Sequence, residues 1–427
     1  MVLPIPPRDR IIFLKFCCRE GGVMITMEEV FTYDNLLAGY YHVRKGKRHK
    51  KNAIDYGRKV YENLYVLQKR ILAGKYRPKA IFSFVVYEPK ERFITANYFE
   101  DKIVQYVLTE YALKPLIQPK LIHDNYASQD GKGSKLAIDR LEKFLYQFSK
   151  ETNWTNEGYV LTCDIKKFFY MIDQTIAISM INKLKMDKTL KGMISNQIRA
   201  YGYKFNQYTD EENRGICIGF QTSQWIAVYY LSGLDHFIKE KLKIKYYGRY
   251  MDDFYLIHKD KEYLEHCMEE IRKYVEDKLH LSLNKKTHIH PINQGVCFIG
   301  YRAELNEKTH KVDIHVRRKS VKREWKRLRK QIKHLTDMVS VGKTVESMTS
   351  WYSYAKRSTD DYIASIYKAM FKYVANNSQG ILQEIDPAKE YNEKVYELSG
   401  YSPLSLKYAN FQLGISSRCE LELPDNQ

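Results

Sequence analysis

Tyr250-Met251-Asp252-Asp253 is the stretch around which the rest of this chain is organised. Apolar runs at 244–247 and 254–257 flank it, and such runs on either side of a short polar break predict a strand–turn–strand hairpin. The two carboxylates would then lie at its tip. Asp also suits a solvated turn, but two adjacent like charges between strands repel each other and call for solvent or a cation.

A second acidic position upstream favours the cation. The run 159–163 predicts a short strand that ends in Asp164. One Asp at the end of a strand and two at the tip of a hairpin can together surround a pair of divalent cations. Mg²⁺ takes a near-octahedral shell of oxygens at about 2.0–2.1 Å, usually from one or two carboxylates and substrate phosphates. These groups are what two-metal phosphoryl transfer requires.

Four segments, in order, resemble the motif set of reverse transcriptases. They are Asp164-x-x-x-Phe168-Phe169, Gly215-Ile216-Cys217-Ile218-Gly219-Phe220-Gln221-Thr222-Ser223-Gln224, Tyr250-Met251-Asp252-Asp253 and Phe298-Ile299-Gly300-Tyr301. The resemblance covers roughly residues 30–375. It implies an α+β fold of the right-hand polymerase type, with fingers, a palm built on an antiparallel sheet, and a helical thumb.

The resemblance also implies a division of the chain. The expected parts are an N-terminal extension (1–30), fingers (31–158), a palm (159–305, with a fingers-side segment at about 174–214), a helical thumb (306–378) and a C-terminal tail (379–427).

The overall charge predicts a polyanionic partner. Lys and Arg number 70 against 51 Asp and Glu, which gives a formal net charge of +19. A basic surface can also serve a membrane, but no run approaches the roughly 20 apolar residues of a membrane span. The first apolar stretch is broken by Lys15 and makes a poor signal peptide. We therefore expect a cytoplasmic protein.

Cysteine and histidine do not predict a metal centre of their own. The seven cysteines are scattered and contain no C-x-x-C pair, which argues against a disulfide framework and a zinc site. His288 and His290 would share one face of a strand, and without a third ligand this indicates ordinary strand polarity.

Two basic segments are candidates for binding the nucleic-acid backbone. The first contains Arg44, Lys45, Lys47 and Arg48. The second is a predicted helix with an apolar stripe and basic residues on its other faces, including Lys322, Arg323, Lys326 and Arg329. Like charges this dense are either a solvated surface or a phosphate-binding patch. A basic amphipathic helix also suits a membrane surface or calmodulin, but after a palm we expect a thumb helix along duplex phosphates.

The resemblance implies roles for further residues. Asp164, Asp252 and Asp253 would be catalytic and, with Ile165, would hold two Mg²⁺ ions, which Mn²⁺ can replace. The expected nucleotide-binding residues are Lys90, Arg92, Phe168, Phe169, Ile218, Gly219, Gln224 and Lys286. Arg92 would bind the triphosphate on a hairpin formed by 81–87 and 92–95. Phe169 would exclude a ribose 2′-hydroxyl, although an ordinary core aromatic remains an alternative, and Lys286 would protonate pyrophosphate.

The implied activity is RNA-directed DNA synthesis, with an RNA template, a DNA or RNA primer and dNTPs. Most reverse transcriptases have Gln-Gly where this chain has Ile218-Gly219, and many have Ser-Pro where it has Ser223-Gln224. That departure is similar to the enzymes of diversity-generating retroelements, which implies errors at template adenines, a small accessory variability protein and a structured template-repeat RNA. The alternatives are a group II-intron-like, retron or phage-defence reverse transcriptase, and a non-catalytic RNA-binding protein with a polymerase fold.

Overall fold

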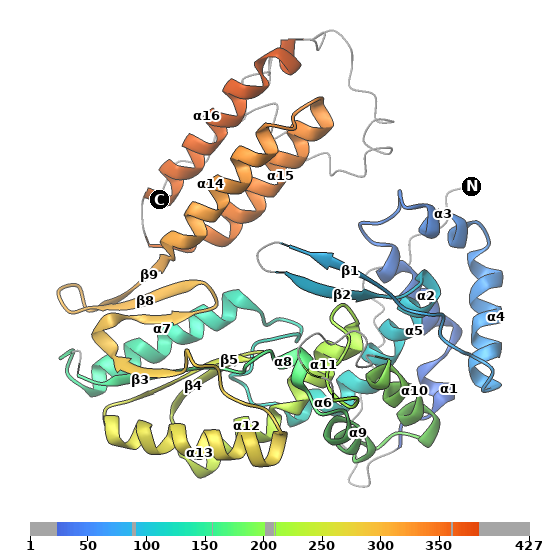
Figure 1. Ribbon diagram of the computed structural model, residues 1–427, viewed down its shortest axis with the longest axis horizontal. Coiled ribbons are helices and arrows are strands. Elements are labelled where there is room, and N and C mark those ends of the chain that lie inside the picture. The colour runs from blue at the N-terminus through green and yellow to red at the C-terminus, as the bar shows by residue number, and fades with distance from the viewer. Residues whose placement is uncertain are drawn as a thin grey trace.

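The computed structural model describes residues 24–87, 91–155, 157–200, 209, 211–359 and 362–383. Figure 1 shows a palm built on strands, fingers made mostly of helices at one end of it, and helices of a thumb rising from the other end. The α+β right-hand fold predicted from the sequence is therefore confirmed.

The palm sheet has the strand order β4-β5-β3-β6, with every neighbouring pair antiparallel. Its strands are β3 (Tyr159–Asp164), β4 (Tyr246–Tyr250), β5 (Asp253–His258) and β6 (His288–Pro291). Successive side chains of a strand point to opposite faces. Leu161 and Leu256 pack with the core beneath helix α13 (Lys261–Leu279), whereas Val160 and Ile257 pack with the core beneath α7 (Ser134–Glu151). Burial on both faces explains why these strands read as continuous apolar runs.

The fingers combine helices from two stretches of the chain. The first stretch holds α1 (Met27–Val30), α2 (Tyr33–Arg44), α3 (Lys51–Arg58), α4 (Val60–Leu72), the hairpin β1 (Phe82–Val86) and β2 (Arg92–Ala96), α5 (Phe99–Leu108) and α6 (Lys114–Ile117). The second, after β3, holds α8 (Phe168–Met171), α9 (Gln174–Asn182), α10 (Lys188–Arg199) and α11 (Gln221–Tyr230), and α12 (Ser232–His236) then packs against α13 of the palm. In Figure 1 the hairpin points from the fingers towards the thumb side.

Two boundaries in the fingers are visible only in the structure. The helical segment 51–72 is broken at Lys59, whose φ of −128° is outside the helical range, and Ile54 is exposed on the short α3. The part of the expected N-terminal extension that the structure describes already belongs to the fingers. There the Ile25 N–H donates to the Lys185 carbonyl (3.1 Å), and the Met27 N–H donates to the Asp187 carboxylate (2.9 Å).

A second, three-stranded sheet joins the palm to the thumb. It contains β7 (Val296–Phe298), β8 (Tyr301–Asn306) and β9 (Lys311–Val316), in the order β7-β8-β9. The range predicted as a helical thumb begins at 306, but β9 pairs along its whole length with β8, so the helices begin only at Arg318. The alternation of Val312, Ile314 and Val316 towards the core is a strand pattern and explains the difference.

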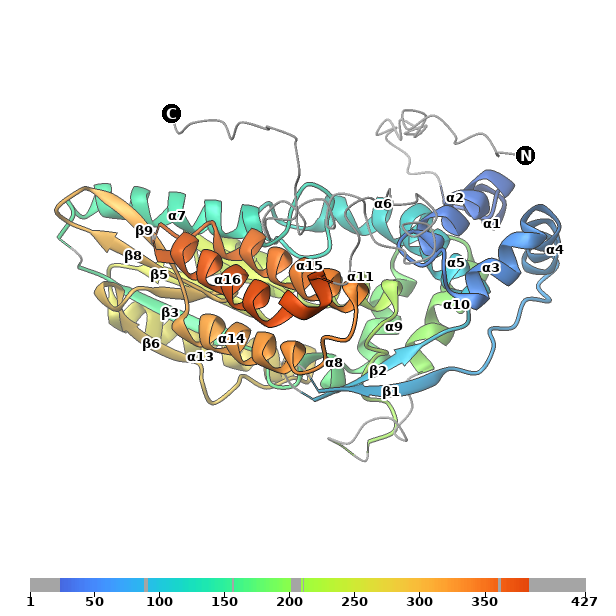
Figure 2. The ribbon, with the colours of Figure 1, turned by 90° about the horizontal axis from the view of Figure 1, so that it is seen from above.

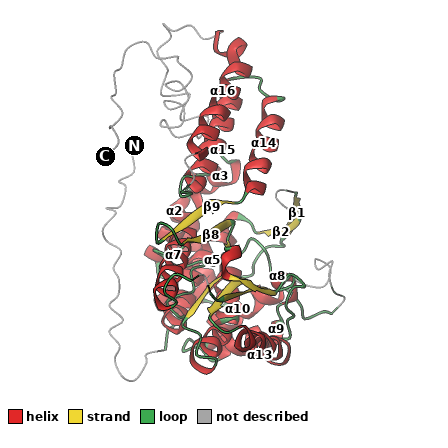
Figure 3. Ribbon diagram, turned by 90° about the vertical axis from the view of Figure 1, so that its left-hand side faces the viewer, coloured by secondary structure: helices red, strands yellow, loops and turns green. Residues whose placement is uncertain are grey.

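The thumb is a bundle of α14 (Arg318–Ile332), α15 (Met338–Ala355) and α16 (Tyr362–Gln383). Seen from above in Figure 2, these helices lie over the palm beside one another, and Figure 3 shows them as a helical layer separate from the strands. Leu328, Val345, Trp351 and Met370 are part of its buried core, and Leu328 lies on the apolar side of the first helix. The tail from 384 onward lies outside the described residues.

The described part of the chain contains no helix that is long and apolar enough to span a bilayer. Its cysteines at 163, 217, 267 and 297 are all free thiols.

Candidate active site

The hairpin of β4 and β5 places two carboxylates at one edge of the palm sheet. Tyr250 and Asp253 are the last paired residues, so Met251 and Asp252 form the turn between the strands. Two-residue hairpin turns require positive φ, and Met251 adopts a φ of 55°. A left-handed conformation is uncommon for a residue other than glycine and marks a site whose backbone is held by its surroundings.

The third carboxylate comes from the neighbouring strand. Asp164 ends β3 directly opposite Asp253 on β5. The chain beyond Asp164 stays attached to the turn, because the Ile165 N–H donates to the Asp252 carbonyl at 3.2 Å. The convergence of Asp164, Asp252 and Asp253 that the sequence predicted is therefore present in the structure.

Burial, together with neighbouring negative charge, makes Asp252 and Asp253 difficult to ionise. Burial raises the pKa of Asp252 to about 6, and the charge of Asp164 adds to the increase. Burial likewise raises the pKa of Asp253 to about 7, helped by the charges of Asp164 and Asp252. Arg92 opposes the shift at Asp252, and Arg317 opposes it at Asp253. A bound cation would favour the ionised forms of all three.

Main-chain and amide groups orient two of these carboxylates. The Asn284 side chain donates to Asp164 Oδ2 at 2.8 Å, and the Asn284 N–H donates to the Asp164 carbonyl at 2.7 Å. The Ile299 N–H donates to Asp253 Oδ2 at 3.4 Å from a turn in which Ile299 itself has a φ of 41°. Sequence reasoning did not single out Asn284, although it begins the polar turn after Leu283.

The carboxylate oxygens suit a hard cation for which the protein supplies only some of the ligands. Within the described residues, no cluster of three or more His, Cys, Asp or Glu side chains forms a metal cage on its own. Mg²⁺ at phosphoryl-transfer sites usually retains waters and takes further oxygens from substrate phosphates, so an open set of carboxylate oxygens is the arrangement it uses. Ile165 buries its side chain, and so it can contribute only main-chain atoms.

The expected nucleotide-binding elements are tied together by main-chain hydrogen bonds. The Thr95 N–H on β2 donates to the Ile218 carbonyl at 2.8 Å, and the Ile216 N–H donates to the Phe169 carbonyl at 2.9 Å. Gly219 has a φ of 118°, and a Cβ there would lie 2.5 Å from the Thr95 carbonyl oxygen. Only glycine therefore permits this approach of the hairpin to the loop. Arg92 begins the same strand β2 and is exposed.

The other residues predicted to bind the nucleotide differ in their exposure to solvent. Phe168, expected among the nucleotide-binding residues, begins helix α8 and is 2% exposed, so its side chain packs in the core. Phe169 beside it is partly exposed. Gln224 is exposed on α11, with the Ser128 hydroxyl 3.5 Å from its carbonyl oxygen. Lys286 is exposed two residues beyond Asn284, and Lys90 lies outside the described residues.

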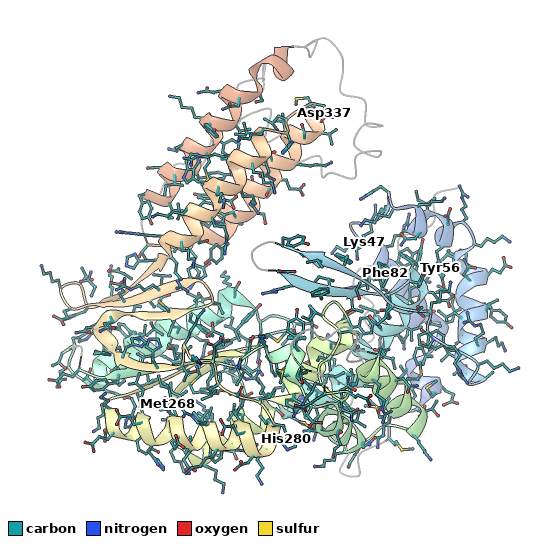
Figure 4. The ribbon with its side chains drawn as sticks, in the orientation of Figure 1. Lys47, Tyr56, Phe82, Met268, His280 and Asp337 are labelled. Atoms are coloured by element: carbon teal, nitrogen blue, oxygen red, sulfur yellow. The ribbon has the colours of Figure 1, made fainter. Side chains whose placement is uncertain are left out.

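The basic segments are both exposed. Lys45, Lys47 and Arg48 are exposed after α2, and Arg44 is partly buried at its end. Lys322, Arg323, Lys326 and Arg329 are exposed on α14. Figure 4 labels Lys47 and also Phe82, which begins β1 on the same side of the fingers. Phe82 and Phe84 expose 48% and 47% of their surface, which is unusual for large apolar rings in a strand.

Comparison with known proteins identifies a family. The family model for reverse transcriptase (RNA-dependent DNA polymerase) matches residues 88–312, more than half of the chain. No curated protein matches the chain.

Solved structures with a similar arrangement include telomerases. The truncated apo telomerase of Candida tropicalis has a TM-score of 0.41 and 15% identity, with 55% of each chain covered. The telomerase of Candida albicans in complex with the TWJ fragment of telomeric RNA has a TM-score of 0.43 and 10% identity, covering 83% of this chain and 67% of that one. For the apo telomerase of Candida tropicalis the values are 0.42 and 13%, covering 80% and 64%. This chain thus spans 55% of the first of these proteins.

Proposed function

Because this chain belongs to the reverse transcriptase family, we propose that it is an RNA-directed DNA polymerase that extends a DNA or RNA primer with dNTPs along an RNA template. The observation that carries the proposal is the pairing of Asp164 with Asp253 across β3 and β5, next to Asp252 in the turn. An idle site would have no reason to retain three neighbouring acids when burial and mutual charge raise the pKa of Asp252 and Asp253.

In the proposed mechanism the three carboxylates and the main chain at Ile165 hold two Mg²⁺ ions, which Mn²⁺ can replace. When bound, the ions lower the pKa of the primer 3′-hydroxyl and offset the charge of the leaving pyrophosphate. Arg92 binds triphosphate oxygens through the paired donors of its guanidinium. Phe169 places a ring against the sugar and excludes a 2′-hydroxyl, and Lys286 donates a proton to the departing pyrophosphate.

The surroundings of the incoming nucleotide support these roles. Gly219 leaves room for backbone to approach a ligand, and its loop is bonded to the strand that carries Arg92. Gln224 and Ile218 flank this glycine on α11 and the preceding loop. Lys90 would add a second cation on the hairpin.

Two surfaces are suited to the nucleic acid on either side of the carboxylates. The exposed cations of α14, Lys322, Arg323, Lys326 and Arg329, would follow the phosphates of the duplex. On the fingers, Arg44, Lys45, Lys47 and Arg48 would bind the template backbone. The exposed rings of Phe82 and Phe84 offer faces on which unpaired bases can stack.

Templated primer extension tests the proposal. The unchanged chain should extend a primer on an RNA template in Mg²⁺, and Asp252→Asn should reduce extension to background because it removes one of the charges that hold the cations. Asp277→Asn, an exposed substitution on α13, is the matched control and should leave extension unchanged. Equal extension by the parent and Asp252→Asn would refute the assigned role, and binding of RNA without any extension would favour the non-catalytic alternative.

At a finer level we propose that the chain is the cytoplasmic polymerase of a diversity-generating retroelement. It would copy a structured template-repeat RNA with errors at adenines, together with a small accessory variability protein. Ile218, where most relatives have Gln, supports this assignment, because an apolar side chain cannot fix the paired nucleotide through directional hydrogen bonds. Ile218 is partly exposed beside Gly219.

Sequencing of the extension products tests this finer proposal. Ile218→Gln should lower misincorporation opposite template adenine relative to the parent and leave errors at the other bases unchanged. Equal adenine error rates in the two proteins would remove Ile218 as the cause. Uniformly low errors in the parent would favour an intron-like, retron or phage-defence enzyme.

A further inference from the structure

A fully buried ion pair lies directly behind the catalytic turn. Asp235 on α12 and Arg249 on β4 both have side chains with no exposed surface. Arg249 Nε donates to Asp235 Oδ1 and Arg249 Nη2 donates to Oδ2, each at 2.6 Å, so the pair is bidentate. Apolar residues of similar volume can replace a buried ion pair without loss of stability. Stability alone therefore does not account for this pair.

Arg249 also donates hydrogen bonds to the turn between β4 and β5 and to helix α11. Arg249 Nη1 donates to the carbonyl of Met251 at 2.8 Å, and Nη2 also donates to the carbonyl of Val228 at 3.2 Å. Met251 is the turn residue with positive φ, immediately before Asp252. Val228 belongs to α11, which follows the Gly219 loop. One planar guanidinium thus connects the acidic turn to the helix behind the nucleotide loop.

Asp235 is itself fixed from two further sides. The Tyr247 hydroxyl donates to Oδ1 at 2.6 Å, and the Asn125 side chain donates to Oδ2 at 3.4 Å. The backbone of Arg249 is also bonded on both sides, since its N–H donates to the Asp124 carbonyl and its own carbonyl accepts from the Tyr126 N–H, each at 3.0 Å. The guanidinium is therefore held in one orientation.

We propose that Arg249, oriented by Asp235, is a positioning residue for catalysis. Its hydrogen bond to the Met251 carbonyl holds the turn in the left-handed conformation and so sets the direction in which Asp252 and Asp253 present their carboxylates. The inference rests on the proposed polymerase function. Lysine cannot substitute, because a single ammonium group cannot replace a planar fork that binds both Asp235 oxygens and two carbonyls at once.

Two variants separate positioning from simple stabilisation. Arg249→Lys keeps the charge opposite Asp235, and the double variant Arg249→Met with Asp235→Leu replaces the pair by apolar groups. For each variant, thermal unfolding, the Kd for primer–template, kcat and KM for dNTP, and Mn²⁺ binding by the substrate-free protein are measured. We expect kcat to fall about 10- to 100-fold in both, because small misplacements of reacting groups have effects of this size. The Kd and KM should change by less than about threefold, and Mn²⁺ binding should weaken.

Arg140→Lys is the matched control. Arg140 also pairs with an acidic residue that is largely buried, Asp124, at 2.8 Å, and stacks on Phe144, but no hydrogen bond joins its side chain to the turn. It should retain the parental kcat and Mn²⁺ affinity even where its unfolding temperature falls.

A double variant with parental kcat and parental Mn²⁺ affinity would overturn the proposal. If the double variant does not fold, Arg249→Lys alone tests the proposal. Parental kcat and parental Mn²⁺ affinity of Arg249→Lys, measured at a temperature where this variant is folded, would then overturn it. If the parent protein itself does not polymerise, the proposed function fails. In that case Mn²⁺ binding still tests the turn, and equal affinity of the parent and Arg249→Lys would reject the role of Arg249.

Discussion

At the scale of single residues, the site is a cluster of acids in which ionisation is unfavourable until a cation arrives. Burial raises the pKa of Asp253 furthest, to about 7, and the charges of its partners Asp164 and Asp252 add to that increase. The buried negative charge that would attract a cation therefore destabilises the metal-free fold. This link makes the role of the carboxylates measurable without any assay of polymerisation.

We expect Asp253→Asn to stabilise the metal-free protein at pH 8 by roughly 1–3 kcal/mol, since one pKa unit corresponds to about 1.4 kcal/mol. The folded-state pKa of Asp253 is raised, so the folded state holds its proton more tightly than the unfolded state. The contribution of Asp253 to stability is therefore greatest below about pH 4 and is lost as the pH rises through about 7.

Chemical denaturation in EDTA at pH 5 and pH 8 measures this effect. The loss of stability between the two pH values should be smaller in Asp253→Asn than in the parent. Asp55→Asn, an exposed change on α3, should behave like the parent. A parental pH dependence in Asp253→Asn would contradict the assignment.

The convergence of the three acids could be predicted from the sequence, but their hydrogen-bond partners could not. Asp164, Asp252 and Asp253 each lie beside an apolar strand pattern, and a hairpin necessarily brings the last two together. Asn284 reaches Asp164 across 120 positions of sequence. Its partnership depends on how β3 and the 283–287 turn pack, and no local pattern encodes that packing.

At the scale of elements, the β1–β2 hairpin is the part of the fold that the sequence predicted best. The segments 81–87 and 92–95, expected to form a hairpin, contain β1 and β2, which pair from Phe82 with Ala96 to Val86 with Arg92. Patterning gave no sign of α8, which follows the strand predicted to end at Asp164. Lys167 has a φ of 50° there and turns the chain into a short helix. A left-handed lysine gives no signal in the sequence.

Arg92 tests the role of the hairpin. Arg92→Ala should raise the KM for dNTP about tenfold or more with a smaller effect on kcat, because the lost contact would be made to the ground-state triphosphate as well. Arg92→Lys should restore part of the loss, since an ammonium keeps the charge and loses the paired donors.

Steady-state kinetics on one primer–template measures both Arg92 variants. Arg272→Ala removes an exposed cation on α13 and should have no effect. A parental KM in Arg92→Ala would place the triphosphate elsewhere.

At the scale of the whole molecule, charge and architecture together suggest how the duplex is held. The formal charge of +19 indicates a polyanion but does not say where it lies. The structure adds that α14 carries its basic residues outward, while its apolar side packs against α15 and α16 in the thumb core. The thumb boundary itself was misplaced, because β9 belongs to a sheet that only tertiary pairing reveals.

Replacement of Lys322, Arg323, Lys326 and Arg329 by Gln should weaken primer–template binding at every sequence. The slope of log K against log salt should decrease by roughly 1 to 3, since each lost phosphate contact releases about one counterion fewer. A matched variant replaces Lys261, Arg272, Lys273 and Lys278 on α13 by Gln. It makes the same change in net charge and should alter the slope far less. Equal slopes in the two variants would show that α14 acts only through overall charge.

The hydrogen bond between Thr95 and Ile218 has a consequence for how the hairpin moves. The β1–β2 hairpin cannot move independently of α11. If the hairpin moves, it must either carry the start of α11 along or break this hydrogen bond, which costs about 1 kcal/mol. Any displacement of β2 is therefore coupled to the start of α11 by a bond that belongs to the protein alone.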